Sequence, residues 1–165
     1  MSSLSGDLTG GCACGRVRYR LKVEPMITHC CHCTWCQRET GSVFVINAVI
    51  EMSEVELLGD GPEMVLTPSA SGKGQPIARC PECRVAVWSH YQNAGALAAF
   101  IRAGTLDDKS AVAPDVHIFT SSKVPWLELS DGKPVFAEFY PNPRAVWTRE
   151  ASARWSAMMA MRKAQ

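Results

Sequence analysis

Hydrophobic and polar residues alternate along much of the chain, which is the pattern of a β-strand with one buried face. The clearest case is 16–23, where the apolar positions are Val17, Tyr19, Leu21 and Val23 and the basic ones are Arg16, Arg18, Arg20 and Lys22. An apolar, β-branched run at 43–50 is typical of a strand buried on both faces. Shorter runs predict strands at 55–58, 64–67, 85–91, 98–103 and 117–120. The body of the chain is therefore expected to be all-β.

Turn residues separate these segments, and the period changes near the C-terminus. Positions 59–62 form a break, and 69–76 predicts a flexible loop. Asn142 is a good helix N-cap and Pro143 suits the first helical position. A stripe at three- and four-residue spacing then follows: Trp147, Ala151, Trp155, Met158, Met159 and Arg162. We expect a terminal amphipathic helix whose stripe packs on its own sheet, with a homodimer contact as the alternative.

Composition narrows the class of partner. The chain has 165 residues, of which 47% are hydrophobic, so it suits one domain with a core of its own. Its 17 Lys and Arg against 16 Asp and Glu give a net charge of +1, which supplies no electrostatic footprint for nucleic acid. No apolar run reaches the length of a membrane span, and the N-terminus lacks the pattern of a signal peptide. We expect a cytoplasmic protein with a small-molecule partner.

Seven of the eight cysteines fall into three clusters with zinc-ligand spacing, and these are Cys12 with Cys14, Cys31 with Cys33 and Cys36, and Cys80 with Cys83. Disulfides are the competing interpretation, but a chain with its own core and no secretion signal does not need them. Each pair alone leaves a zinc half-coordinated, so the two pairs together predict a closed structural site. The middle cluster leaves a fourth position that is open or filled by a residue the sequence does not identify. We expect one structural zinc and one catalytic, partly occupied zinc.

Longer motifs surround these cysteines. They are GCACGRVRY at 11–19, HCTWCQRETGS at 32–42, CPEC at 80–83, GTLDD at 104–108 and HIFTSSKVPW at 117–126. In this order they resemble the glutathione-dependent formaldehyde-activating enzyme family over about residues 10–136. The resemblance implies a zinc-stabilised, tent-like fold of antiparallel sheets, with the outer clusters on the structural metal and the middle cluster on the catalytic one. It places a zinc-binding all-β domain at 1–140 and the helix, packed on it or extending from it, at 141–165.

The resemblance also implies an activity. Glutathione would join formaldehyde to give S-hydroxymethylglutathione, formally a carbon–sulfur lyase reaction run in reverse. A zinc held by three thiolates is electron-rich, so it suits holding a substrate thiolate better than generating hydroxide. The catalytic residues would then be Cys31, Cys33 and Cys36. Arg38 or Lys123 would lie near a carboxylate of the bound tripeptide.

Other residues have competing interpretations. Trp35 and Trp126 are candidates to line the pocket, with a place in the core as the alternative. His32 is a weaker candidate ligand for the catalytic zinc, and Cys30 is either a small buried residue, a spare ligand or a redox-sensitive thiol. The remaining histidines, His29, His90 and His117, are interpreted as hydrogen-bonded strand or loop residues. The two acidic residues of GTLDD, Asp107 and Asp108, are interpreted as part of a turn.

One position departs from the family pattern. The family usually has Cys-Gly-Thr at the end of the third cluster, where this chain has Cys83-Arg84-Val85. Glycine adopts positive φ at little cost, so Arg84 must either accept that geometry with strain or alter the turn.

Two non-enzymatic interpretations stay open. One is a zinc-stabilised binding or chaperone module of the same fold. The other is a chromatin-associated protein like centromere protein V, which resembles the same family, although the balanced charge argues against a nucleic-acid partner.

Overall fold

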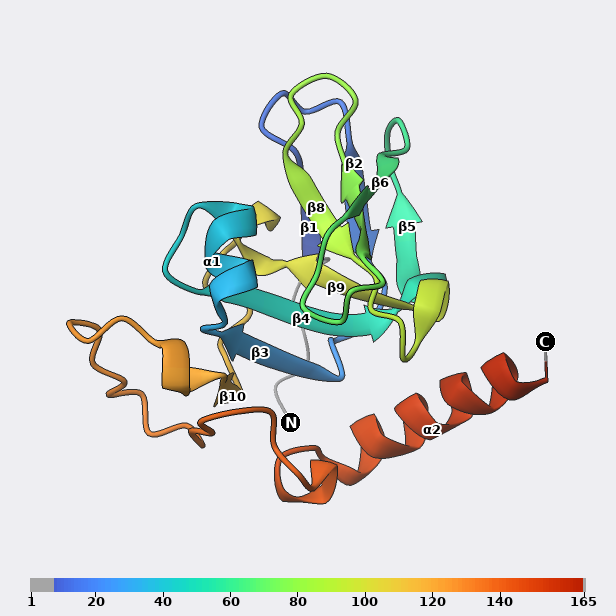
Figure 1. The fold of residues 1–165 in the computed structure, drawn as a ribbon. Helices are drawn as coiled ribbons and strands as arrows, with labels where there is room; N and C mark the ends of the chain where they lie inside the picture. Colours follow the sequence, from blue (N-terminus) through green and yellow to red (C-terminus); the bar gives the residue numbers. More distant parts are fainter. Residues whose placement is uncertain (1–7, 165) are drawn as a thin grey trace.

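The computed structural model describes residues 8–164 and is mainly β (Figure 1). Within this range the larger sheet has the strand order β10-β3-β4-β9-β8-β7-β6, and the smaller has the order β1-β2-β5. The strands are β1 Leu8–Gly11, β2 Arg18–Leu21, β3 Ile27–Cys31, β4 Val45–Glu51, β5 Val55–Leu57, β6 Glu63–Thr67, β7 Gln75–Arg79, β8 Ala86–Ser89, β9 Ala98–Arg102 and β10 Val116–Ile118. The mainly β fold is confirmed. The strand pairs are antiparallel as expected, except that β10 pairs with β3 in parallel.

The main core lies between the two sheets. The alternation at 16–23 is reproduced in β2, where Tyr19 and Leu21 are buried. The Tyr19 ring meets the ring of Trp88 from β8 edge to face, with 5.9 Å between centroids. Ala48 and Ile50 of β4 belong to the same cluster of buried residues. Alternate residues of a strand point to opposite faces. The burial of Ala48 and Ile50 in this cluster therefore shows which face of β4 is directed toward the smaller sheet.

The other face of the larger sheet carries two helices, α1 at Thr34–Thr40 and α2 at Arg149–Lys163. The body is thus not all-β, and α1 corrects that expectation. A polar segment of seven residues gives no clear apolar period, but its ends are well capped. The side chain of Cys33 accepts a hydrogen bond from the backbone of Cys36, and Gly41 ends the helix with φ of 71°. Beneath the helices lies a second buried cluster that includes Cys31, Cys36, Val49 and Ala151.

The C-terminal helix begins later than the sequence predicts. Asn142 does cap a turn, but this is the short 3₁₀ turn Pro143–Ala145. The indole of Trp147 then donates to the Tyr140 hydroxyl over 2.6 Å, which holds the chain against the body. Thr148 caps α2 by accepting from the backbone of Ala151.

The stripe of α2 packs on the protein's own core, as expected. Ala151 and Met158 are buried, and Trp155 contacts both neighbouring clusters. Two of the predicted stripe residues behave differently from the rest, because Trp147 precedes the helix and the Arg162 guanidinium donates to the backbone carbonyls of Gln92 and Asn93.

Three strands lie outside the sequence prediction, namely β1, β3 and β7. The expected loop at 69–76 is too long by two residues, since Gln75 and Pro76 begin β7. Pro76 has no backbone N–H to donate, but its carbonyl accepts a hydrogen bond from the His90 N–H. GTLDD is more than a turn, since the Asp107 carboxylate binds Arg18 and accepts from Thr9, both in the smaller sheet. No helix in residues 8–164 has both the length and the apolarity to cross a bilayer.

Arg154 anchors α2 to the larger sheet. Its guanidinium donates to both carboxylate oxygens of Glu51, at 2.9 and 2.5 Å, and to the Glu24 carbonyl at 2.9 Å. Burial is the largest single effect on the Glu51 carboxylate and raises its pKa, but the Arg154 hydrogen bonds, the backbone N–H of Glu51 and the Arg154 charge together outweigh burial and lower the pKa of Glu51 from its ordinary value. The pair's contribution to stability is therefore complete above about pH 4.5 and is lost as the pH falls through the lower folded pKa.

Replacing Arg154 with Ala should lower the free energy of unfolding by about 2 kcal/mol near neutral pH, because a largely buried carboxylate loses its partner. Urea unfolding at several pH values measures this, and the difference from wild type should shrink below about pH 4. Arg149→Ala is the matched control, since Arg149 is exposed on the same helix. Equal losses in both variants would contradict the assigned anchor.

Candidate metal centres

Four cysteine side chains meet where the two sheets approach each other. Cys12 and Cys14 lie in the turn between β1 and β2, and Cys80 and Cys83 lie in the turn between β7 and β8. Their Sγ atoms are all within 4.8 Å of one another. The fold thus brings together the two pairs that the sequence analysis joined, one from each sheet.

The geometry of this cluster fits a tetrahedral ion. Cys14 Sγ lies 3.5 Å from Cys12 Sγ and 3.6 Å from Cys80 Sγ. Zinc–sulfur bonds of about 2.3 Å at tetrahedral angles place sulfur ligands roughly 3.8 Å apart. The Val17 backbone also donates to Cys12 Sγ at 3.3 Å, which favours a thiolate. Since all eight cysteines are free thiols, this donor set suits a structural zinc.

Arg84 accepts the positive φ, with strain, and does not alter the turn. Its φ is 63°, in the left-handed region, and its backbone N–H donates to the Cys80 carbonyl at 3.0 Å. Its side chain reaches Glu63 at 2.6 Å on the surface. The turn around Cys80 and Cys83 therefore keeps a positive φ at the position where the family has glycine, and this chain carries the strain.

The middle cluster lies on the opposite face of the larger sheet. Cys31 ends β3, Cys33 is the N-cap of α1, and Cys36 lies in the first turn of α1. Cys36 Sγ is 3.5 Å from Cys31 Sγ, and all three Sγ atoms are within 4.8 Å of one another. Cys31 and Cys36 are buried, whereas Cys33 is half-buried. Three convergent thiols with one nearer to solvent suit a metal site with an open position.

Charge within this trio is unevenly shared. Hydrogen bonds from Cys31 and Cys36 lower the pKa of the Cys33 thiol, and the backbone N–H groups of Cys36 and Trp35 at the start of α1 act in the same direction. The same sulfur contacts raise the pKa of Cys31. The contacts at the start of α1 therefore favour the thiolate form of Cys33.

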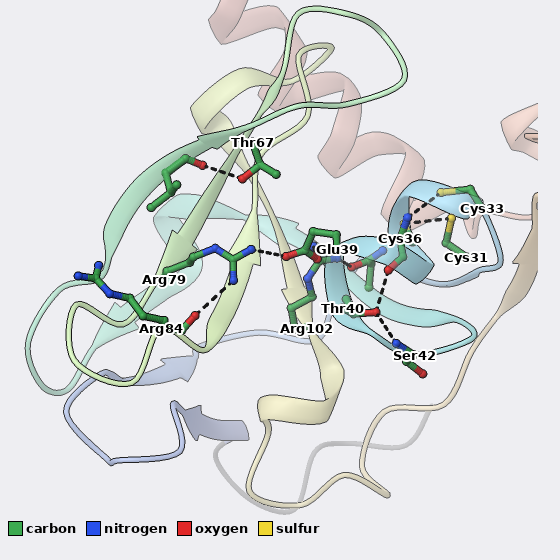
Figure 2. A network of polar contacts seen from close by, with 12 residues as sticks. Cys31, Cys33, Cys36, Glu39, Thr40, Ser42, Thr67, Arg79, Arg84 and Arg102 are labelled. Carbon is green, nitrogen blue, oxygen red and sulfur yellow. Dashed lines mark hydrogen bonds and ion pairs between the residues drawn. The ribbon is translucent and has the colours of Figure 1, made fainter.

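A partly buried ionic network fixes α1 to the sheet, and Figure 2 shows it beside the trio. Glu39, one turn after Cys36, accepts from Arg79 of β7 at 2.5 Å and from Arg102 of β9 at 2.8 Å. Arg102 also donates to Asn47 of β4 at 2.6 Å. Sequence reasoning did not identify this network. The sequence does contain one indication of it, because Glu39 follows Cys36 by three residues, a spacing that places both side chains on one face of a helix.

The predicted substrate-binding residues lie in different environments. Arg38 is exposed on α1 and has no ion pair within residues 8–164. The Lys123 ammonium instead donates to the carbonyls of Val124 and Leu127, so it holds its own loop. Trp35 and Trp126 are 43% and 71% exposed, so neither is a core aromatic.

Two histidines are hydrogen-bonded as interpreted. His29 Nε2 lies 2.8 Å from the Tyr140 hydroxyl, and burial lowers the pKa of His29 to about 4. His90 Nδ1 lies 2.7 Å from the Ala98 carbonyl. His32 does not point toward the trio. It contacts Cys30 and His117 on the other side of β3.

The strain at Arg84 gives a stability prediction. Arg84→Gly should be about 1 kcal/mol more stable than Arg84→Ala, because only glycine adopts positive φ without a steric penalty and both variants lose the surface ion pair equally. Thermal unfolding of the zinc-loaded proteins measures the difference. Glu82 provides the control, because its φ is not positive. Here the order should reverse, so that Glu82→Ala is more stable than Glu82→Gly by about 0.5 kcal/mol. The same order at both positions would refute the assigned strain.

One of three comparisons with known proteins identifies the family of this chain. The family model described as glutathione-dependent formaldehyde-activating enzyme matches residues 7–122. Curated proteins give no significant match. Among solved structures, a crystal structure of a Rhodobacter sphaeroides protein from structural genomics is 15% identical, with a TM-score of 0.46, and the alignment covers 78% of this chain and 99% of that one. Because the family match spans well over half of the sequence, the chain belongs to the glutathione-dependent formaldehyde-activating enzyme family.

Proposed function

We propose that this protein joins a thiol to a small aldehyde, with glutathione and formaldehyde as the best-supported pair, and so acts as a carbon–sulfur lyase in the reverse direction. The observation that carries the proposal is the convergence of Cys31, Cys33 and Cys36 at the start of α1, inside the residues that the family model matches. A closed four-thiol cluster elsewhere already suits the structural role. A second cluster with one member nearer solvent suits chemistry.

Each cluster has a separate role in this proposal. Cys12, Cys14, Cys80 and Cys83 hold a structural zinc that ties the two sheets together. The trio would hold a second zinc, whose chemistry would be to favour the deprotonated form of a substrate thiol. Glu39 and Arg102 keep α1, and therefore Cys33 and Cys36, in place on the sheet.

The reaction balances without an oxidant or reductant. The substrate sulfur uses an electron pair to form the carbon–sulfur bond, the carbonyl π pair moves to oxygen, and that oxygen takes up a proton. The protein's contribution is to bring thiolate and aldehyde together and to keep the thiol deprotonated at neutral pH.

The candidate recognition residues lie on α1, which carries Cys36, and on the 123–127 loop, whose Leu127 lines the cavity on the other side of β3. Arg38, exposed on α1 and without an ion pair among residues 8–164, suits a glutathione carboxylate. Lys123 contributes by holding the 123–127 loop, and Trp126, exposed on that loop, offers an aromatic surface to the ligand.

Exchange spectroscopy between formaldehyde and S-hydroxymethylglutathione tests the activity, because the uncatalysed reaction makes end-point yields uninformative. The zinc-loaded protein should raise the exchange rate above the enzyme-free rate. Cys33→Ser should lose this increase and one zinc while its unfolding midpoint changes little. Cys80→Ser should lose the other zinc and several kcal/mol of stability, since structural zinc contributes directly to folding.

Thr34→Ala is the matched control for Cys33→Ser, because Thr34 is the exposed neighbour on the same helix and carries no thiol. A fully loaded wild-type protein that exchanges no faster than buffer, with other thiols equally inert, would support a non-catalytic binding module instead. A Cys33→Ser variant that unfolds, beside a stable Cys80→Ser, would reverse the two roles.

Arg38 gives a separate test of substrate recognition. Arg38→Ala should raise the KM for glutathione about tenfold with a smaller change in kcat, because a hydrogen bond to a charged group contributes about 1.5 kcal/mol or more. Arg149→Ala removes an equally exposed arginine far along the chain and should leave KM unchanged. If both variants match wild type, Arg38 does not bind the substrate.

A further inference from the structure

A third cluster of ligand-type side chains lies on the face of β3 that the trio does not use. Cys30 and the residue two positions on, His32, point to the same side, because strand side chains alternate. The parallel pairing of β10 with β3 places His117 directly beside Cys30. Cys30 Sγ and one ring nitrogen from each histidine lie within 4.8 Å of one another, and all three residues are buried.

Two of the three distances between donor atoms are close to those expected for ligands of one ion. His32 Nε2 lies 3.5 Å from Cys30 Sγ and 3.0 Å from His117 Nδ1. A tetrahedral zinc with bonds of about 2.0 Å to nitrogen and 2.3 Å to sulfur separates such ligands by roughly 3.6 and 3.3 Å. Small shifts of the rings would therefore complete the geometry.

Asp131 completes the expected surroundings of a metal-bound histidine. Its Oδ2 lies 2.8 Å from His117 Nε2, the ring nitrogen that faces away from the cluster. Metal-ligating histidines usually donate this second N–H to a carboxylate or carbonyl, which directs the lone pair of the first nitrogen at the ion. One thiolate and this carboxylate would also balance the charge of a divalent ion.

Two arrangements account for these contacts. In the first, two neutral rings form a hydrogen-bond chain, in which His32 Nε2–H donates to His117 Nδ1 and His117 Nε2–H donates to Asp131, and Cys30 Sγ is left outside this chain. In the second, a cation accepts the lone pairs of all three groups at once. The second arrangement uses every member of the cluster.

The cluster also opens onto a cavity. A space of about 220 Å³ is lined by Cys30, His32, His117 and Asp131 together with apolar residues that include Phe44 and Leu127. This volume exceeds what one water needs, since a water occupies about 30 Å³ in the liquid. A fourth ligand therefore has room to approach.

We propose that Cys30, His32 and His117 form a third metal site, separate from both cysteine clusters, that takes a zinc-like divalent cation and leaves its fourth position to water or a small ligand from the cavity. His117 is a ligand and Asp131 is its positioning residue.

Zinc is the probe. The full chain, loaded with Zn²⁺ and freed of weakly held metal, should contain three zinc ions per chain, and Cys30→Ser should contain two. A crystal of the wild type measured at the zinc edge should show an anomalous peak between Cys30 Sγ, His32 Nε2 and His117 Nδ1, which tests the site without any variant. Cys33→Ser should also contain two zinc ions but keep this peak, so the result does not depend on the proposed function.

Asp131→Asn should weaken the third zinc by about 10- to 100-fold in chelator competition, as loss of a histidine's carboxylate partner usually does. The matched control is Asp108→Asn, because Asp108 is an exposed carboxylate that accepts only from residues of its own turn. Equal zinc in wild type and Cys30→Ser, or no anomalous peak at the three atoms, would overturn the proposal in favour of a hydrogen-bond chain from His32 through His117 to Asp131.

Discussion

The alternation of side chains along β3 is the constraint on which the chemistry of this protein depends. Successive residues of a strand must point to opposite faces. At the end of β3 the sequence Cys-Cys-His-Cys therefore divides into two sets, with Cys31 and Cys33 directed to the helical face and Cys30 and His32 to the other. A shift of one residue in the pairing with β4 would exchange the two sets, so the register of β3 decides which thiols meet α1.

The four-cysteine cluster has a different relation to the fold. The smaller sheet has only three short strands, and its contacts with the rest come from the shared core and from the turns at its ends. Cys12 and Cys80 are themselves buried members of that core. Metal binding there would join a turn of the smaller sheet to a turn of the larger one. Cys14 and Cys80, whose sulfur atoms are in contact, are 66 residues apart in sequence. Long-range closure of this kind is expensive in chain entropy, which is why a strong cross-link is useful at this place.

The sequence predicted what depends on local pattern and ligand number. Tyr19 and Leu21 point inward because alternation is a property of the strand itself, and the pairing of the outer cysteine clusters follows from counting ligands. The start of α2 was predicted too early, because Asn142 and Thr148 are both good helix caps. Asn142 caps only a 3₁₀ turn, and the tertiary contact of Trp147 with Tyr140 lies between this turn and the helix that Thr148 begins. Helix α1 depends on a thiol cap that residue preferences do not indicate. The meeting of His117 with Cys30 depends on a parallel pairing across 87 residues, which no local pattern encodes.

The position of Glu39 has a consequence for how the two cysteine clusters are connected. One oxygen of this carboxylate holds Arg79, which immediately precedes Cys80, and the other holds Arg102 beneath the helix that carries Cys36. The turn after β7 and the start of α1 lie on opposite faces of one sheet, and a single carboxylate is bound from both sides between them. The two clusters therefore share one ionic anchor as well as one sheet.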